Sequence, residues 1–287
     1  MLVNQSPASS QSVAIGGDLQ KQIATIAKSI PGRVGVAASV VETGEVVQWQ
    51  GNAEFPMQSV YKLPIAMAVL NQVDEGRLKF DQRVNVEKVN YIAKPQHSPI
   101  RDEYQDGTVI SISELLRYAV SESDGSASDI VMAQAGGPAV VMSYLNSIGV
   151  RDIKVADTER TLGLDATSQY RNWAKPVEAV KLLGLLQQGV GLSASSRSYL
   201  LRLMTETETG LNRLKGQLPQ GVKVAHKTGT SQTTNGVTAA TNDIGLITVD
   251  EHKHIALAVF IKDSAASTKE REAVIAQVAK LVYDRWK

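Results

Sequence analysis

The sequence has 287 residues, of which 43% are hydrophobic and 21% are charged, a composition typical of a globular protein with a sizeable core. The 30 Lys and Arg residues balance 29 Asp and Glu residues, so the net charge provides no electrostatic surface for nucleic acid or an anionic membrane. The absence of cysteine excludes disulfides, thiolate metal sites and a cysteine nucleophile.

The first residues, 1–16, are polar and rich in Ser and Gln, and we expect them to form a loose tail. They lack the basic and apolar regions of an intact signal peptide, so the chain is either the mature form of an exported protein or a cytoplasmic protein. The sequence contains no run of 18 apolar residues that would predict a membrane span.

Strands are predicted near both ends of the chain. A helical pattern from residue 17 is followed by β-branched stretches over 34–41 and 46–49, which predict a hairpin. At the other end, β-like stretches precede a closing amphipathic helix over 268–286. These expected strands cover residues 222–226, 236–241, 244–249 and 255–261.

The middle of the chain is rich in helical patterns. Ser111 to Glu114 has capping-box spacing before an apolar stretch, and Ser126 to Asp129 gives a similar helix start. Residues 151–172 lack periodicity and predict a long surface loop, which is uncommon in a compact domain unless it has a function. Helices are expected after this loop, over 176–186 and 194–205.

This order of elements predicts an α/β protein of the α+β type. An antiparallel five-stranded sheet, flanked by the terminal helices, would be formed by residues 17–55 and 206–287. An all-helical domain that contains the 151–172 loop would be inserted between them, over 56–205. The active site is expected between the sheet and the helical domain.

Ser59 and Lys62 are the first candidates for catalysis. Pro56 and an apolar run from Leu63 predict a helix that starts near Ser59, so that positions 59 and 62 share one face. The helix dipole favours a developing negative charge at Ser59, and a neighbouring lysine can activate a serine hydroxyl. Alone, a Ser-x-x-Lys spacing also occurs by chance as a solvated first helical turn.

Two further motifs follow along the chain. Ser123-Asp124-Gly125 lies between two predicted helices and alone would be an ordinary turn. Lys227-Thr228-Gly229-Thr230 lies in a β-like stretch, where the glycine would let a ligand approach the strand edge; alternatively, the lysine protects an exposed edge. The three motifs occur in order on a helix start, a turn and a strand, and together they are far more specific than any one alone.

These motifs resemble the Ser-x-x-Lys, Ser-Asp-Asn and Lys-Thr-Gly motifs of class A β-lactamases and penicillin-binding proteins, and the similarity extends from about residue 17 to Trp286. The resemblance implies an acyl-enzyme on Ser59 and no metal or organic cofactor. It also implies that Glu159, in the 151–172 loop, activates the deacylating water, which would separate a β-lactamase from a D,D-peptidase.

Several positions depart from the family pattern. Gly125 replaces an Asn that contacts the acylamino group of the substrate, and Gly163 replaces an Asn that helps to hold the water. Asp157 and Asn172, at the positions of the family's loop ion pair, cannot form it. Residues 169–173 resemble instead a divergent extended-spectrum branch, for which bulky oxyimino-cephalosporins are the expected substrates.

The resemblance places the other site residues on both sides of the cleft. Arg213 matches an alternative position for the arginine that binds the substrate carboxylate, because Ile244 fills the usual one; otherwise it is a surface arginine. His97 would be an aromatic gate or a plain loop histidine. The expected catalytic group is completed by Lys62, Ser123, Lys227 and Thr230, and the expected binding group by Thr228, Gly229, Thr230 and Ser231.

The remaining histidines are given structural interpretations. His226 is expected to be structural, and His252 and His254 suit a hairpin turn better than a metal site, because no further ligands accompany them. Other proteins of this superfamily fit the motifs as well: a D,D-peptidase, a promiscuous esterase, or a penicillin sensor that stays acylated. We expect a periplasmic or secreted monomer whose partner is a β-lactam, with no nucleic acid or membrane partner.

Overall fold

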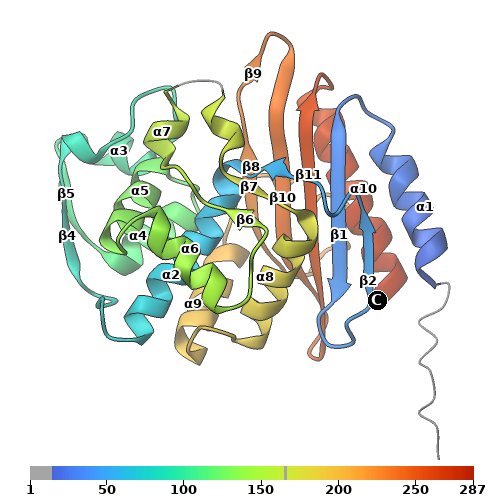
Figure 1. Cartoon of the computed structure of the whole chain (residues 1–287), viewed down its shortest axis with the longest axis horizontal. Helices are drawn as coiled ribbons and strands as arrows, with labels where there is room; N and C mark the ends of the chain where they lie inside the picture. Colours follow the sequence, from blue (N-terminus) through green and yellow to red (C-terminus); the bar gives the residue numbers. More distant parts are fainter. Residues whose placement is uncertain (1–14, 165–166) are drawn as a thin grey trace, which may run out of the picture.

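The main sheet is antiparallel and is built from both ends of the chain, as the computed structural model shows for residues 15–164 and 167–287 (Figure 1). Its strands follow the order β2–β1–β11–β10–β8, and the short β9 pairs with β10. The strands are β1 (Arg33–Val40), β2 (Val46–Trp49), β8 (Val224–Thr230), β9 (Thr233–Thr234), β10 (Val237–Asp250) and β11 (Lys253–Ser264). The predicted antiparallel sheet is therefore confirmed, with β9 as an addition. The expected polar tail lies, up to residue 14, outside the described residues.

The strands near the C-terminus differ from their predicted bounds. β10 is one strand where two were expected, because its pairing with β11 continues without a break across Asn242 and Asp243. These two polar residues interrupt the hydrophobic pattern, yet both are fully buried. β8 begins later than expected and extends to Thr230, since it pairs with β10 from Val224 onwards. The whole Lys-Thr-Gly-Thr segment therefore lies in the sheet, at its edge.

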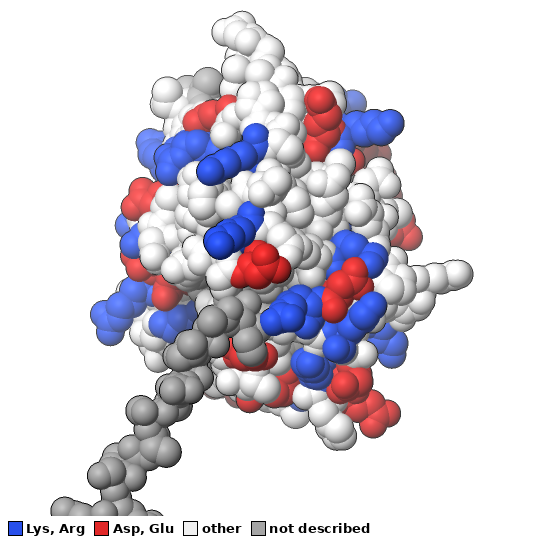
Figure 2. Space-filling model, turned by 90° about the vertical axis from the view of Figure 1, so that its right-hand side faces the viewer, with Lys and Arg blue, Asp and Glu red and all other residues white. Residues whose placement is uncertain are grey.

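Two terminal helices cover one face of this sheet. They are α1 (Ile15–Ala27) and α10 (Thr268–Trp286). Their apolar residues and the facing side chains of β1 and β11 form one of the two hydrophobic cores. A capping box between Ser267 and Glu270 fixes the start of α10. On the side of the molecule that carries α1, basic and acidic side chains are intermixed (Figure 2), as the balanced composition predicts.

The other sheet face contacts α8 and, beyond it, the helical region (Figure 1). Within this region α2 is buried on nearly every side and forms the centre of the larger core. The remaining elements are β3 (Phe55–Pro56), η1 (Gln58–Tyr61), α2 (Lys62–Asp74), β4 (Arg83–Val86), η2 (Lys88–Asn90), α3 (Pro99–Glu103), β5 (Thr108–Ser111), α4 (Ile112–Val120), α5 (Gly125–Gln134), α6 (Pro138–Ser147), β6 (Ile153–Lys154), α7 (Glu159–Leu162), η3 (Ser168–Tyr170), β7 (Trp173–Ala174), α8 (Pro176–Gln188) and α9 (Ala194–Thr205). The division into two domains at 56 and 205 stays a prediction.

Two local expectations about these elements are corrected. The second helix start is capped by Asp124, which accepts from the backbone N–H of Ala127, and not by Ser126. The 151–172 segment is not a plain loop, because it contains β6, α7 and η3. The capping box at Ser111 and Glu114 is confirmed. None of the helices in the described part of the chain is long and apolar enough to cross a membrane.

Candidate active site

Ser59 lies in the first turn of the helical segment that continues as α2. Gln58, immediately before it, has a positive φ of 47°, a strained conformation that is uncommon for non-glycine residues. Lys62 follows one turn later and is almost fully buried, at 1% exposure. Its ammonium donates to the carbonyl oxygen of Ser123 at 2.6 Å. A buried cation is thereby fixed beside the serine.

Ser123 lies between α4 and α5, and it also has a positive φ, of 60°. Its hydroxyl accepts a 2.8 Å hydrogen bond from the ammonium of Lys227. The next residue, Asp124, is fully buried and accepts hydrogen bonds from Ala127 N, Ile100 N and Ser98 Oγ. These contacts hold the turn against α3 and α5, so Ser123 occupies a fixed position between two lysines.

The strand β8 forms the opposite side. Lys227 is fully buried, and burial, followed by the positive charge of Lys62, lowers its pKa well below the usual lysine value. Gly229 was expected to admit a ligand, but the close neighbour is the chain itself. A Cβ at position 229 would lie 2.2 Å from the carbonyl oxygen of Met57. The glycine therefore allows the segment that carries Ser59 to pack against the strand.

Glu159 is the first residue of α7. Its backbone N–H and that of Arg160 donate to the two carboxylate oxygens of Asp129, at 2.6 and 2.9 Å. Burial raises the pKa of Asp129 to about 6, an effect that these hydrogen bonds oppose and that the charge of Glu159 reinforces. The carboxylate of Glu159 lies 3.5 Å from the ammonium of Lys62 and accepts from the phenol of Tyr61 at 2.8 Å.

The segment around Glu159 is anchored by Asn172. Its amide oxygen accepts from the backbone N–H groups of Ala156 and Asp157, and its amide nitrogen donates to the carbonyl of Asp157. Asp157 and Asn172 indeed form no ion pair with each other. The carboxylate of Asp157 lies instead 2.7 Å from Nε of Arg171, so an Arg–Asp pair is present within this segment with a different arginine.

These elements enclose a cleft of about 650 Å³, a size typical of small-molecule sites. Nine of the predicted site residues line it: Ser59, Lys62, His97, Ser123, Glu159, Gly163, Thr228, Thr230 and Ser231. Sequence reasoning missed other lining residues: Gln58, Pro95, Gln96, Leu162, Gln169, Thr209, Gln232 and Thr234. Lys227 lies behind Ser123 and reaches the cleft through that hydroxyl. The buried ammonium of Lys62 and the carboxylate of Glu159 thus face a hydroxyl-rich cleft, and Lys227 lies behind it.

Comparison with known proteins assigns the chain to a family. A model described as the beta-lactamase enzyme family matches residues 18–286. The chain belongs to that family. Extended-spectrum beta-lactamase PER-1 of Pseudomonas aeruginosa is 41% identical over 92% of this chain and 86% of that protein. Beta-lactamase VEB-1 of the same organism is 38% identical over 93% of this chain and 90% of its own length.

Solved structures agree with this assignment. A β-lactamase from Chitinophaga pinensis superposes with a TM-score of 0.90 at 40% identity, covering 93% of this chain and 98% of that one. The TLA-1 extended-spectrum β-lactamase superposes with a TM-score of 0.91 at 39% identity, covering 94% and 98%. The expected class A family, its fold and its enzyme class, a serine β-lactamase, are confirmed.

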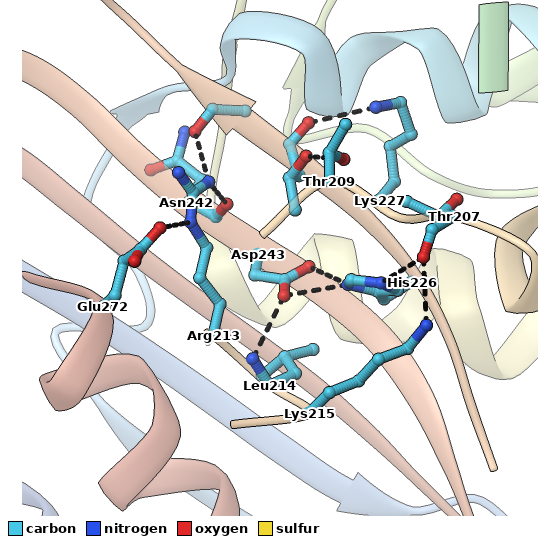
Figure 3. A network of polar contacts seen from close by, with 12 residues as sticks. Thr207, Thr209, Arg213, Leu214, Lys215, His226, Lys227, Asn242, Asp243 and Glu272 are labelled. Carbon is cyan, nitrogen blue, oxygen red and sulfur yellow. Dashed lines mark hydrogen bonds and ion pairs between the residues drawn. The ribbon is translucent and has the colours of Figure 1, made fainter. Parts of the chain in front are cut away.

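In this β-lactamase, Arg213 lies behind β8 and not in the cleft. It is 5% exposed, and Figure 3 shows it between Glu272 and Asn242. Its guanidinium donates to the carbonyl oxygens of Asn242 and Gly229 and pairs with Glu272. One further N–H donates to Thr230 Oγ1 at 2.7 Å. The surface-arginine alternative is therefore wrong, and Arg213 reaches the cleft through Thr230.

The two glycine departures are both next to Glu159. Gly125 is buried at the start of α5, where a Cβ would lie 2.6 Å from Cγ of Glu159. At Gly163 a Cβ would lie 2.4 Å from Oε1 of Gln96, whose side chain fills that space. Gln96 Nε2 in turn makes a hydrogen bond with the carbonyl oxygen of Glu159. Gln96 had no sequence signal, because its partner is 63 residues away.

The histidines of the β-lactamase have partners that explain them. His226 is fully buried and its Nδ1 contacts the carboxylate of Asp243 (Figure 3), as a structural histidine should. His254 lies in β11 and not in the expected turn, and it contacts Glu42, which follows β1. His97 lies at the rim of the cleft, where Nε2 contacts the carbonyl of Glu122. The described residues contain no cluster of three His, Asp or Glu side chains that could hold a metal ion.

Proposed function

We propose that this enzyme hydrolyses β-lactams through an acyl-enzyme on Ser59, which water activated by Glu159 then releases. The observation that carries the proposal is the convergence of Lys62, Ser123, Glu159 and Lys227 around one cleft that contains Ser59. A nucleophile, bases, a proton relay and a carboxylate for water are the parts that this reaction requires.

In acylation, the hydroxyl of Ser59 attacks the lactam carbonyl. Either Lys62 directly or Glu159 through a water takes the hydroxyl proton. The backbone N–H groups of Ser59 and Thr230 form the oxyanion hole, and such donors are worth roughly 3 kcal/mol each at the transition state. Ser123, hydrogen-bonded to Lys227, passes a proton to the departing lactam nitrogen.

The substrate carboxylate binds at the β8 side. Thr228, Thr230 and the charge of Lys227 receive it, with Arg213 behind Thr230. Ser231 and His97 line the cleft on either side and contact the substituents of the ring system.

We infer that bulky oxyimino-cephalosporins are substrates, since relatives at about 40% identity bear the name extended-spectrum β-lactamase. Because β-lactams act outside the cytoplasm, we also propose that the enzyme is exported. The balanced charge of the chain supports a monomer.

The test is hydrolysis of a chromogenic cephalosporin. The enzyme is expected to turn over many equivalents, whereas a single stoichiometric burst would indicate a sensor. Ser59→Ala is expected to lower turnover by about 10⁵-fold or more, because the nucleophile is lost. Surviving activity in that variant would remove Ser59 from the mechanism.

Glu159→Gln separates the two half-reactions. Loss of a general base slows a reaction step by about 10²- to 10⁴-fold, so deacylation becomes limiting and a mass adduct accumulates on Ser59. Intact-mass measurement during turnover detects this adduct. Fast turnover without an adduct would contradict the role of Glu159.

A further inference from the structure

Glu159 is held by a phenol to which the mechanism above gives no role. Tyr61 Oη donates a 2.8 Å hydrogen bond to Oε2 of Glu159, and the Tyr61 side chain is fully buried. Tyr61 stands between Ser59 and Lys62 in the sequence, in the turn that starts the catalytic helix. We propose that Tyr61 is a positioning residue that fixes the Glu159 carboxylate for deacylation. The proposal rests on the deacylating role proposed for Glu159.

The surroundings keep the phenol protonated, so that it acts as a donor. Burial, followed by the negative charges of Glu159 and Asp129, raises the pKa of Tyr61 well above its ordinary value. The ammonium of Lys62 lies 3.5 Å from the same carboxylate oxygen. Asp129 holds the backbone of Glu159 from the α5 side. A neutral donor and a buried cation therefore act on one oxygen of the carboxylate.

This arrangement gives the two carboxylate oxygens of Glu159 different functions. Tyr61 and Lys62 both contact Oε2 of Glu159. No residue in 15–164 or 167–287 makes a hydrogen bond or ion pair with Oε1. Since Glu159 lines the cleft, Oε1 is the oxygen left to accept a proton from water. Fixing Oε2 limits rotation of the carboxylate and so orients Oε1.

Gly125 provides the room for this contact. Any side chain at position 125 would meet Cγ of Glu159 at 2.6 Å and Cδ1 of the buried Ile92 at 2.4 Å. Glu159 could then keep its orientation toward Tyr61 only if the core moved. The glycine at 125 and the phenol at 61 are therefore parts of one arrangement, in which η1 supports the Glu159 carboxylate.

Tyr61→Phe tests the proposal because it removes only the donor oxygen. Deacylation of a cephalosporin acyl-enzyme is expected to slow about tenfold to a hundredfold, the effect of losing a hydrogen bond to a charged group. Acylation, measured by stopped flow, should change little, so kcat falls more than kcat/KM.

Tyr144→Phe is the matched control. Tyr144 is a buried tyrosine of α6, and its hydroxyl makes no hydrogen bond within the described part of the chain. Its removal should leave both half-reactions at wild-type rates. Thermal unfolding of both variants checks that the fold is intact. Wild-type deacylation in a folded Tyr61→Phe enzyme would overturn the proposal.

The same substitution in the Glu159→Gln background locates the effect. If Tyr61 acts through the carboxylate, Tyr61→Phe should slow the double variant no further. An equal slowing with and without Glu159 would overturn the positioning role. Rapid deacylation by Glu159→Gln alone would instead overturn the proposed function, so the two failures are distinguishable.

Gly125→Ala disturbs the hydrogen bond between Tyr61 and Glu159 from the side of Glu159. It keeps the phenol but crowds Glu159, so deacylation should slow. The loss of deacylation rate in the Gly125→Ala/Tyr61→Phe double variant should be smaller than the product of the two single losses. Full multiplication of the effects would show that the two positions act independently and would contradict the proposal. If Tyr61→Phe fails to fold, Gly125→Ala alone is the test, and wild-type deacylation in that folded variant would overturn the proposal.

Discussion

The two walls of the cleft are held in place by different interactions. The β8 wall is part of a continuous backbone ladder, in which residues from Val224 to Thr230 pair with β10. The Glu159 wall consists of short elements, α7 and η3, which are positioned by side chains such as Asp129 and Asn172. We expect a substitution on the first wall to alter substrate contacts, and one on the second to move the catalytic carboxylate itself.

This difference also governs how each wall responds to pH. Side-chain anchors can titrate, whereas backbone hydrogen bonds do not. Asp129, whose pKa is about 6, is such an anchor and holds two backbone N–H groups of α7. On the β8 wall the pKa of Lys227 is lowered, but the strand position does not depend on its charge. Substitutions on each wall therefore separate the two kinds of anchor.

Asp129→Asn should change how stability depends on pH. A pKa raised from 3.8 to about 6 means that the folded state binds the proton more tightly than the unfolded state. The resulting stability is present below pH 4 and is lost as pH rises through 6, by up to about 3 kcal/mol. Wild type should therefore lose stability relative to Asp129→Asn between pH 4 and 7.

Urea unfolding of both proteins across this pH range measures the difference. Asp81→Asn, at an exposed position, is the control and should run parallel to wild type. Parallel curves for Asp129→Asn and wild type would show that Asp129 is not the titrating anchor.

Asn172→Ala should lower the free energy of unfolding by about 2 kcal/mol, because two backbone N–H groups and one backbone carbonyl lose their hydrogen-bond partner. Three hydrogen bonds to residues 156 and 157 depend on this amide. Deacylation should slow as Glu159 becomes mobile, while acylation is affected less. Asn146→Ala, at an exposed position on α6, is the control for both urea unfolding and kinetics. Equal losses in both half-reactions would mean that the whole cleft has been disturbed.

The same contrast separates what the sequence predicts from what it does not. Lys227 and Ser59 were placed correctly because strand and helix patterns extend over many neighbouring residues. The cap of α5 was misplaced, since Asp124 and Ser126 are both good caps and the choice depends on contacts with Ser98 and Ile100, more than 20 residues away. Side-chain contacts between distant segments leave no local pattern.

The loop shows this limit most clearly. Its Glu159 could be identified only through the resemblance, and the residues that hold it carry no motif. The hydrogen bond from Tyr61 spans 98 residues and that from Gln96 spans 63. Gly125 and Gly163 were recognised as departures, but their meaning depends on which side chains fill the space beside them.

Arg213→Lys tests the β8 wall. Lysine keeps the charge but cannot reach Thr230 and two carbonyl oxygens at once. We expect KM for an anionic β-lactam to rise about tenfold, equivalent to about 1.4 kcal/mol, with little change in deacylation. Arg271→Lys is the matched control, because Arg271 of α10 is also buried but donates to Thr241, Ala266 and Thr268. A large loss of deacylation in Arg213→Lys would mean that the two walls are coupled.

Arg171→Ala should have the smallest effect, although it removes the ion pair of the loop. Nε of Arg171 is 2.7 Å from Oδ2 of Asp157, yet that oxygen has no hydrogen-bond partner among the described residues, so the N–H is not directed at it. The arginine side chain is also 54% exposed, and such pairs contribute less than about 1 kcal/mol. Urea unfolding at low and high salt measures the loss, which should shrink as salt screens the pair. A loss as large as that of Asn172→Ala would show that charge pairing, and not the Asn172 amide, holds the Glu159 wall.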